Sequence, residues 1–154
     1  MRVRDERGFT LIELVILLAV MALLAWVALP RSFAGDVKLS AAARQLQSDI
    51  RYAQELAMTR GQHHQIRFYG ASNPSPTNQY QIVTAAGQPV LHPLTRSGSF
   101  VVDFNNTPWA GLTLDSTLTL EFDSLGRPDA AKTISLNSGA KVITVTAETG
   151  RVSF

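Results

Sequence analysis

The sequence contains no cysteine, which excludes a disulfide-stabilised scaffold, a thiolate metal site and a cysteine nucleophile. Charged residues are also few. They make up 17% of the 154 residues, below the usual ~25%, which excludes a charged disordered chain and a coiled coil. The net charge of +2 is too small to indicate a nucleic-acid partner by itself. The apolar share of 45% is ordinary, and the length suits one globular domain with one core.

The apolar residues are concentrated in one run, residues 9–29, which contains a single charged residue, Glu13. As a helix rising about 1.5 Å per residue, this run is about 30 Å long, the thickness of the hydrocarbon core of a bilayer. Three arginines precede the run, whereas one arginine and one lysine follow it closely. The excess of positive charge before the run predicts a single-pass helix with a cytoplasmic N-terminus and an exported C-terminal part.

Three interpretations of this run compete. Residues 32–34 resemble the cleavage site of a secretory signal peptide, which would leave a chain starting near Gly35, but the run exceeds the usual ~7–15 apolar residues. A plain membrane anchor leaves Glu13 unexplained, because a carboxylate near the centre of a membrane helix costs roughly 2.5–3.5 kcal/mol. In the third interpretation Glu13 is functional, and its carboxylate pairs with a group of another molecule.

The residues around the start of the run, Arg7-Gly8-Phe9-Thr10-Leu11-Ile12-Glu13, resemble the signal of type IV pilins and type II secretion pseudopilins. The resemblance implies that a prepilin peptidase cuts between Gly8 and Phe9 and then methylates the new amino group of Phe9. It also implies that Glu13 faces the N-terminal amine of a neighbouring subunit during assembly. In a low-dielectric setting such a pair is tolerated, whereas either charge alone is costly.

The amphipathic pattern continues the helix beyond the apolar run. From residue 32 to about residue 59, apolar residues recur at spacings of three and four, and Gly61 predicts an end just past Arg60. Residues 9–60 are thus compatible with one long helix. Pro30, which lies where many pilins have a proline, marks either a kink in this helix or the end of its membrane part. The expected stripe that packs on a sheet consists of Leu39, Ala42, Leu46, Ile50, Ala53 and Ala57.

After Gly61 the apolar period changes to two, and turn-rich segments separate short runs. A long helix followed by many short strands indicates an α+β fold, with the helix packed on a C-terminal antiparallel β-sheet domain. The expected strands are residues 64–69, 79–83, 88–91, 99–104, 112–114, 117–122, 133–136, 142–146 and 150–154. The expected organisation is a leader peptide 1–8, a transmembrane and filament-core helix 9–29, an amphipathic half of the helix 30–60 and a β-rich domain 61–154.

Residues 51–54, 122–128 and 149–152 resemble segments of the H-type minor pseudopilins and the related FimT-like minor pilins. The resemblance implies a structural subunit that sits in the bacterial inner membrane with its C-terminal domain in the periplasm, then enters a filament. A type II secretion pseudopilus and a type IV or mannose-sensitive-haemagglutinin-like pilus remain alternatives. The implied partners are the prepilin peptidase, membrane lipid before assembly, other major and minor pilins or pseudopilins, and an inner-membrane assembly platform with its cytoplasmic ATPase.

No motif indicates catalysis: the sequence has no P-loop, no GxSxG elbow and no HExxH pair, so we predict no enzyme, no catalytic residue and no cofactor. His63 and His64 are adjacent, and on a strand they point to opposite faces, so they do not chelate one ion. We therefore predict no metal site.

DNA binding during DNA uptake is the alternative function, since some FimT-like minor pilins bind DNA through basic residues of their C-terminal part. Against it, residues 96–154 contain five basic and six acidic side chains, a balance that does not attract a polyanion. If DNA is bound, the candidate residues are Arg127, Lys132, Lys141 and Arg151.

Overall fold

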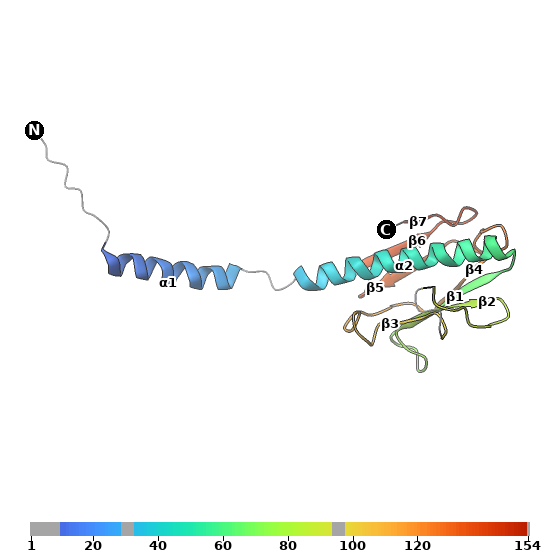
Figure 1. Ribbon diagram of the computed structural model, residues 1–154, viewed down its shortest axis with the longest axis horizontal. Helices are drawn as coiled ribbons and strands as arrows, with labels where there is room; N and C mark the ends of the chain where they lie inside the picture. The colour runs from blue at the N-terminus through green and yellow to red at the C-terminus, as the bar shows by residue number, and fades with distance from the viewer. Residues whose placement is uncertain (1–9, 29–32, 94–97, 154) are drawn as a thin grey trace, which may run out of the picture. The chain divides into compact units, whose positions relative to one another are not determined.

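The computed structural model describes residues 10–28, 33–93 and 98–153. The chain divides into two compact units, residues 1–35 and 36–154. Helix α1 (Leu11–Ala28) belongs to the first unit, and most of helix α2 (Phe33–Arg60) belongs to the second, where it is accompanied by two antiparallel sheets (Figure 1). The expected α+β class, a helix packed on antiparallel strands, is confirmed. Residues 29–32, which include Pro30, lie outside the described residues, as do Gly8 and Phe9.

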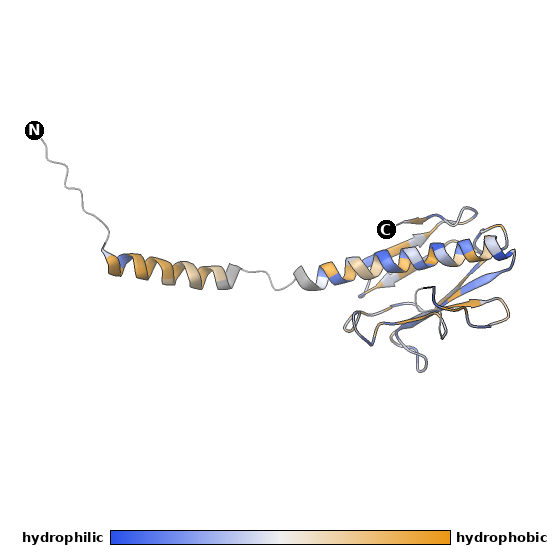
Figure 2. Ribbon diagram, viewed as in Figure 1, coloured by the Kyte–Doolittle hydropathy of each residue, from blue (hydrophilic) through white to orange (hydrophobic). Residues whose placement is uncertain are grey.

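Helix α1 is apolar along most of its length, and Glu13 in its first turn is its one charged residue (Figure 2). Its start is defined by Thr10, whose Oγ1 accepts the backbone N–H of Glu13 at 3.3 Å, and whose carbonyl accepts the N–H of Leu14. Within residues 10–28, 33–93 and 98–153, no helix reaches the length and hydropathy needed to cross a membrane. The expected membrane segment, 9–29, begins and ends on residues outside those ranges.

Helix α2 buries the stripe that its sequence spacing predicts. Leu46, Ile50 and Ala53 are fully buried, and they alternate with exposed polar residues on the opposite side. The helix ends at Arg60, where Gly61 adopts a positive φ of 60° and the N–H of Gln62 bonds the carbonyl of Ala57. This is the glycine-dependent helix end that the sequence predicts.

The strands divide between two sheets. In the first sheet the order is β3-β2-β1-β4, and in the second it is β5-β6-β7, with all neighbours antiparallel. Ile66 pairs with Ile82 and Leu120, and Ile134 pairs with Ile143, so each register places apolar side chains together on one face. The strands are β1 (His64–Tyr69), β2 (Gln79–Thr84), β3 (Val101–Asp103), β4 (Leu118–Phe122), β5 (Lys132–Leu136), β6 (Lys141–Val145) and β7 (Val152–Ser153).

Two expected strands, 88–91 and 112–114, are wrong: each forms only an isolated bridge, at Pro89 and at Leu114. Proline has no N–H to donate to a ladder. The N–H of Leu114 bonds the side chain of Asn78 at 2.8 Å rather than a strand, and Asn78 also donates to the carbonyl of Leu112. A buried asparagine therefore takes the backbone partners that a further strand would need.

One hydrophobic core joins α2 to both sheets. Its largest buried side chains are aromatic, and the rings of Phe68 and Phe104 lie 5.8 and 5.9 Å from the ring of Tyr80. All buried apolar residues among the described ones lie at or beyond Leu39. The second unit consequently contains this whole core.

Candidate functional site

The first part of the site is the start of α1. Glu13 lies in the first turn of the helix and is exposed, and Thr10 caps that turn. A Thr three residues before a Glu is the spacing of a capping box, and a carboxylate near a helix N-terminus is favoured by the helix dipole. Sequence reasoning missed this capping role of Thr10, although the Thr-x-x-Glu spacing signalled it. The proposed cleavage residues Gly8 and Phe9 lie just before it, outside the described residues.

The second part is a junction on α2, centred on Gln54. The side-chain amide of Gln54 donates to the carbonyl of Gly126 at 2.7 Å and to the carbonyl of Thr149 at 3.1 Å. Two turns earlier on α2, Gln47 donates to the carbonyl of Val152 at 2.9 Å. The three segments that resemble the minor pseudopilins, 51–54, 122–128 and 149–152, are thus brought together in space. The role of this junction is to hold two surface turns against the helix.

Two glycines permit this close approach. Gly126 and Gly150 have positive φ values of 79° and 64°. A Cβ atom on Gly126 would lie 2.8 Å from Sδ of Met58, and a Cβ atom on Gly150 would lie 2.5 Å from Nε2 of Gln54. Side chains at these positions would meet both backbone strain and a steric clash.

Asp123 organises the turn that presents Gly126. Its Oδ1 accepts the backbone N–H groups of Leu125 at 2.9 Å and Arg127 at 2.8 Å, and its Oδ2 accepts Nε–H of Arg127 at 2.9 Å. The backbone hydrogen bond from Arg127 is the main cause that lowers the pKa of Asp123 below its ordinary value. Leu125 is left at the apex of the turn with 68% of its surface exposed.

A buried pair joins α2 to the first sheet. The hydroxyl of Tyr80, on β2, donates to Oδ2 of Asp49, on α2, at 2.6 Å. Burial raises the pKa of Asp49, and it raises the pKa of Tyr80 well above the ordinary value for a tyrosine. Sequence reasoning missed this pair, because nothing in the linear pattern shows that a carboxylate on α2 meets a tyrosine on β2.

The two adjacent histidines point apart, as alternation on a strand requires. His64 is fully buried, and its Nδ1 lies 3.0 Å from the carbonyl of Gln62. His63 is exposed, and its Nδ1 lies 2.8 Å from Oε1 of Glu121. Across residues 10–28, 33–93 and 98–153, no group of three or more His, Cys, Asp or Glu side chains is arranged to hold a metal ion.

The structure does not gather the four candidate DNA-binding residues into one patch. Arg127 is paired with Asp123, and Lys132 lies 3.2 Å from Asp129. Lys132 and Lys141 stand at opposite ends of the β5–β6 hairpin. Arg151 is exposed and lies beside α2. Their arrangement does not favour a continuous surface for DNA.

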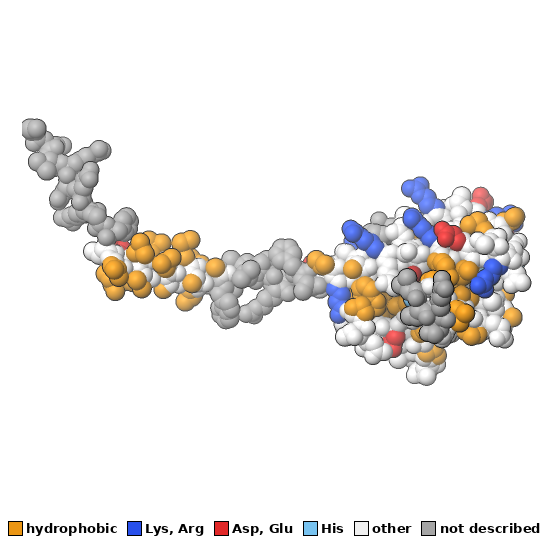
Figure 3. All heavy atoms as spheres, in the orientation of Figure 1, with side chains coloured by type: hydrophobic (Ala, Val, Ile, Leu, Met, Phe, Trp, Pro, Cys, Tyr) orange, Lys and Arg blue, Asp and Glu red, His pale blue; other side chains and the backbone are white. Residues whose placement is uncertain are grey.

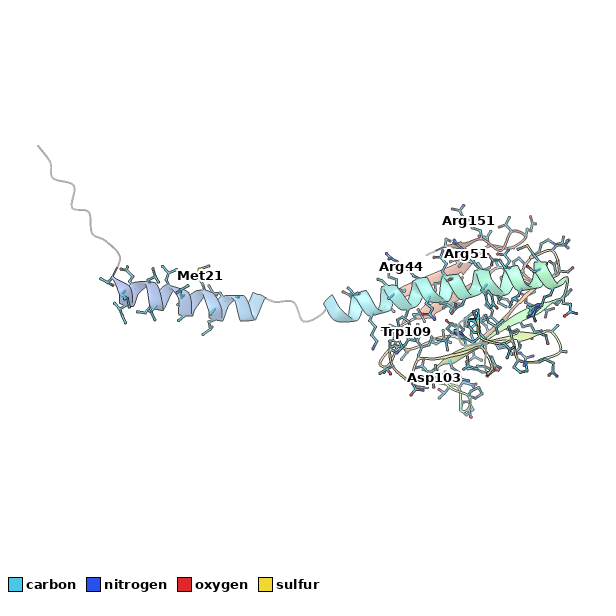
Figure 4. All side chains as sticks on the ribbon, viewed as in Figure 1. Met21, Arg44, Arg51, Asp103, Trp109 and Arg151 are labelled. Carbon is cyan, nitrogen blue, oxygen red and sulfur yellow. The ribbon has the colours of Figure 1, made fainter. Side chains whose placement is uncertain are left out.

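Arg151 belongs instead to the segment that Gln47 and Gln54 hold along α2, and Figure 4 labels it on the same side of the view as Arg44 and Arg51 of that helix, while Figure 3 shows Lys and Arg side chains on this face of the domain. All three side chains are exposed. Nothing in the sequence connects Arg44 and Arg51, which are seven residues apart, with Arg151, which is 100 residues further along the chain than Arg51.

Comparison with known proteins gives two family matches. The model described as the prokaryotic N-terminal methylation motif matches residues 3–29, and the model of the type II transport protein GspH matches residues 42–150. A search of curated proteins found no significant match.

Two solved structures of the type IV minor pilin FimU of Pseudomonas aeruginosa share the fold. The P21 crystal form has a TM-score of 0.55 at 20% identity, covering 81% of this chain and 92% of that one. The P65 form has a TM-score of 0.51 at 18% identity, covering 74% and 90%. The fold shared with these structures and the methylation motif at residues 3–29 are both consistent with the pilin-like class that residues 7–13 resemble.

Proposed function

This chain belongs to the family of the type II transport protein GspH, whose members are structural pilin or pseudopilin subunits, and we propose that it is made as a precursor, cut between Gly8 and Phe9, and methylated on Phe9 before it enters a filament. The observation that supports this proposal most directly is the methylation motif over residues 3–29, which spans the proposed bond. The same chain then continues into the GspH region at residue 42.

The position of the proposed cut suits a peptidase. The first residue of α1 is Leu11, and the cap is Thr10, so the bond between Gly8 and Phe9 precedes the hydrogen-bonded helix. Glycine before the bond offers no side chain to obstruct a peptidase. After cleavage the new amino group would lie one residue before the cap of α1.

Glu13 is proposed to select the register of assembly. It is the acidic residue of the first turn of α1, a helix whose other described side chains are nearly all apolar. Thr10 satisfies the backbone N–H of Glu13, and the side chain of Glu13 is exposed. In a filament core, the N-terminal amine of the next subunit would neutralise it, and a misplaced neighbour would leave two buried charges unpaired.

Membership of a pilin-like family with a prepilin signal implies anchoring in the inner membrane and assembly into a periplasmic filament. We propose the finer arrangement as a leader at residues 1–8, a single membrane and filament-core helix at 9–29 with a cytoplasmic N-terminus, an amphipathic helix at 30–60 with a kink or end at Pro30, and a periplasmic domain at 61–154. The proposed partners are the prepilin peptidase, the inner-membrane platform and other pilins or pseudopilins.

Intact mass and N-terminal sequencing of the protein purified from its native membrane test the proposal. The expected product begins with N-methyl-Phe9 and lacks the first eight residues. A product that begins near Gly35 would indicate an ordinary secretory signal, and an intact Met1 in a cell with active prepilin peptidase would indicate a plain anchor. Either result would overturn the proposal.

A further inference from the structure

The outer face of α2 is apolar at its start, carries two arginines in its middle and ends on the exposed Glu55, four residues after Arg51. Val37, Ala41, Arg44, Ser48 and Arg51 are all exposed, and they follow one another at spacings of three and four. Such residues share one side of a helix. The opposite side of α2 is buried in the core, so this face is the one α2 offers to other molecules.

Arg151 extends the basic part of that face. Gln47 and Gln54 bond the carbonyls of Val152 and Thr149, and these bonds hold the segment 149–152 along α2. Arg51 lies one helical turn from each glutamine. Val152 is buried, so the side chain of Arg151 next to it faces outward, as Figure 4 shows.

These three arginines have no counter-ion of their own. Over residues 10–28, 33–93 and 98–153, no carboxylate lies within ion-pair distance of Arg44, Arg51 or Arg151, whereas Arg127 and Lys132 are paired. Lys38, earlier on α2, donates to the carbonyl of Ala110 and is also engaged within the domain. Among the described residues, an ion pair within the domain therefore does not account for the position of these arginines.

The exposed residues of α2 follow α1 in the chain, and α1 is the helix that needs to be buried in an assembly. An apolar helix such as α1 requires lipid or the apolar helices of other subunits around it. Arg44 comes only 16 residues after Ala28, the last residue of α1. The exposed Val37 and Ala41 lie between them along the chain. Because α2 follows α1 in the chain, subunits that pack their α1 helices together also bring each α2 helix near neighbouring subunits.

We propose that Arg44, Arg51 and Arg151 form a docking surface for an acidic face of a neighbouring pilin-type subunit in the filament. This inference rests on the proposed function. Arg44 and Arg51 are separated by about 10.5 Å along the helix axis, so the partner would present carboxylates at a similar spacing. Guanidinium groups bind carboxylates through two parallel hydrogen bonds, which fix orientation, and the unpaired charges disfavour neighbours without matching acidic groups.

Charge reversal in the full-length protein, expressed in its own bacterium, tests the docking surface. The double variant Arg44→Glu/Arg51→Glu should fall at least about tenfold in the filament fraction, with unchanged total amount and unchanged cleavage at Gly8, because opposed charges now meet. Arg60→Glu is the matched control, since Arg60 is an exposed arginine of the same helix on a different face, and it should enter filaments normally. Incorporation of the double variant at the wild-type level would overturn the inference.

A photo-crosslinking amino acid at Ser48, between the two helix arginines, identifies what lies on this face. The expected adduct contains another pilin-type subunit. It should disappear in the double variant. It should return when the double variant is combined with a partner whose acidic residue at the crosslinked position is changed to lysine. A nuclease-sensitive adduct with DNA, a lipid adduct, or no adduct in protein that is present in filaments would each overturn the inference. If the wild-type protein is itself absent from filaments, the proposed function fails instead.

Discussion

Replacing Gly150 by alanine tests whether the junction at Gln54 is as tightly packed as the structure indicates. The φ of Gly150 is 64°, a conformation that costs an alanine roughly 1–2 kcal/mol. The new Cβ would also lie 2.5 Å from Nε2 of Gln54 and 3.1 Å from Cε1 of the buried Phe122. Because Gln54 is held by two hydrogen bonds, its movement would sacrifice about 1 kcal/mol or more. We expect a total loss of about 2–4 kcal/mol in the free energy of unfolding.

Gly139→Ala is the matched control. Gly139 has a similar positive φ of 82°, but a Cβ there would meet nothing within 4 Å. The free energy of unfolding of Gly139→Ala should fall only by the cost of the positive φ, about 1–2 kcal/mol. Urea unfolding of residues 36–154, the compact unit that contains the whole described core, measures both. Equal losses in the two variants would refute the tight contact. If the contact is real, Gly150→Ala combined with Gln54→Ala should lose less than the sum of the single losses.

The remaining predictions concern the buried pair and the N-terminal signal. Tyr80→Phe should lower the free energy of unfolding at neutral pH by about 1–3 kcal/mol, because Asp49 loses the hydrogen bond from Tyr80 while remaining partly buried. Because the pKa of Tyr80 is raised in the folded protein, its hydroxyl ionises more readily in the unfolded chain. The free energy of unfolding of the wild type should therefore decline as pH rises above 10.0, the ordinary pKa of tyrosine. In an alkaline urea titration, Tyr80→Phe should lack this part of the decline. Gly8→Val should leave a precursor eight residues longer than the mature chain on a gel, and a mature-sized product would contradict the assigned cleavage site. Glu13→Val should still be cut but fail in methylation or filament entry, and normal incorporation would remove the pairing role of Glu13.

Local patterns in the sequence predicted much of the fold. The apolar spacing of α2 and the glycine after Arg60 predicted the buried stripe and the end of the helix. Alternation predicted β1 with its bounds and β2 to within one residue, because each of these strands has one face in the core. Segments 88–91 and 112–114 look equally extended in the sequence. Whether they join a ladder depends on the residues opposite them, here Val83 for Pro89 and the more distant Leu136 for Leu114, and on the side chain of Asn78.

The N-terminal signal was readable without any structure. The methylation motif over residues 3–29 and its apolar run with one carboxylate, Glu13, are properties of consecutive residues. The same holds for the class of the protein, which the family matches over residues 3–29 and 42–150 confirm.

Only the tertiary structure decided what the C-terminal motifs do. Gln54 bonds the carbonyls of residues 72 and 95 positions later in the chain, and the bonds of Gln47 and Gln54 place the segment 149–152, which contains Arg151, along α2. The burial of Tyr80 with Asp49 likewise depends on α2 lying across the first sheet. A side-chain hydrogen bond to a distant carbonyl leaves no periodic trace in the sequence, because it needs only one suitable residue at each end. Periodicity therefore determined the elements and their buried faces, whereas packing alone determined which polar groups meet.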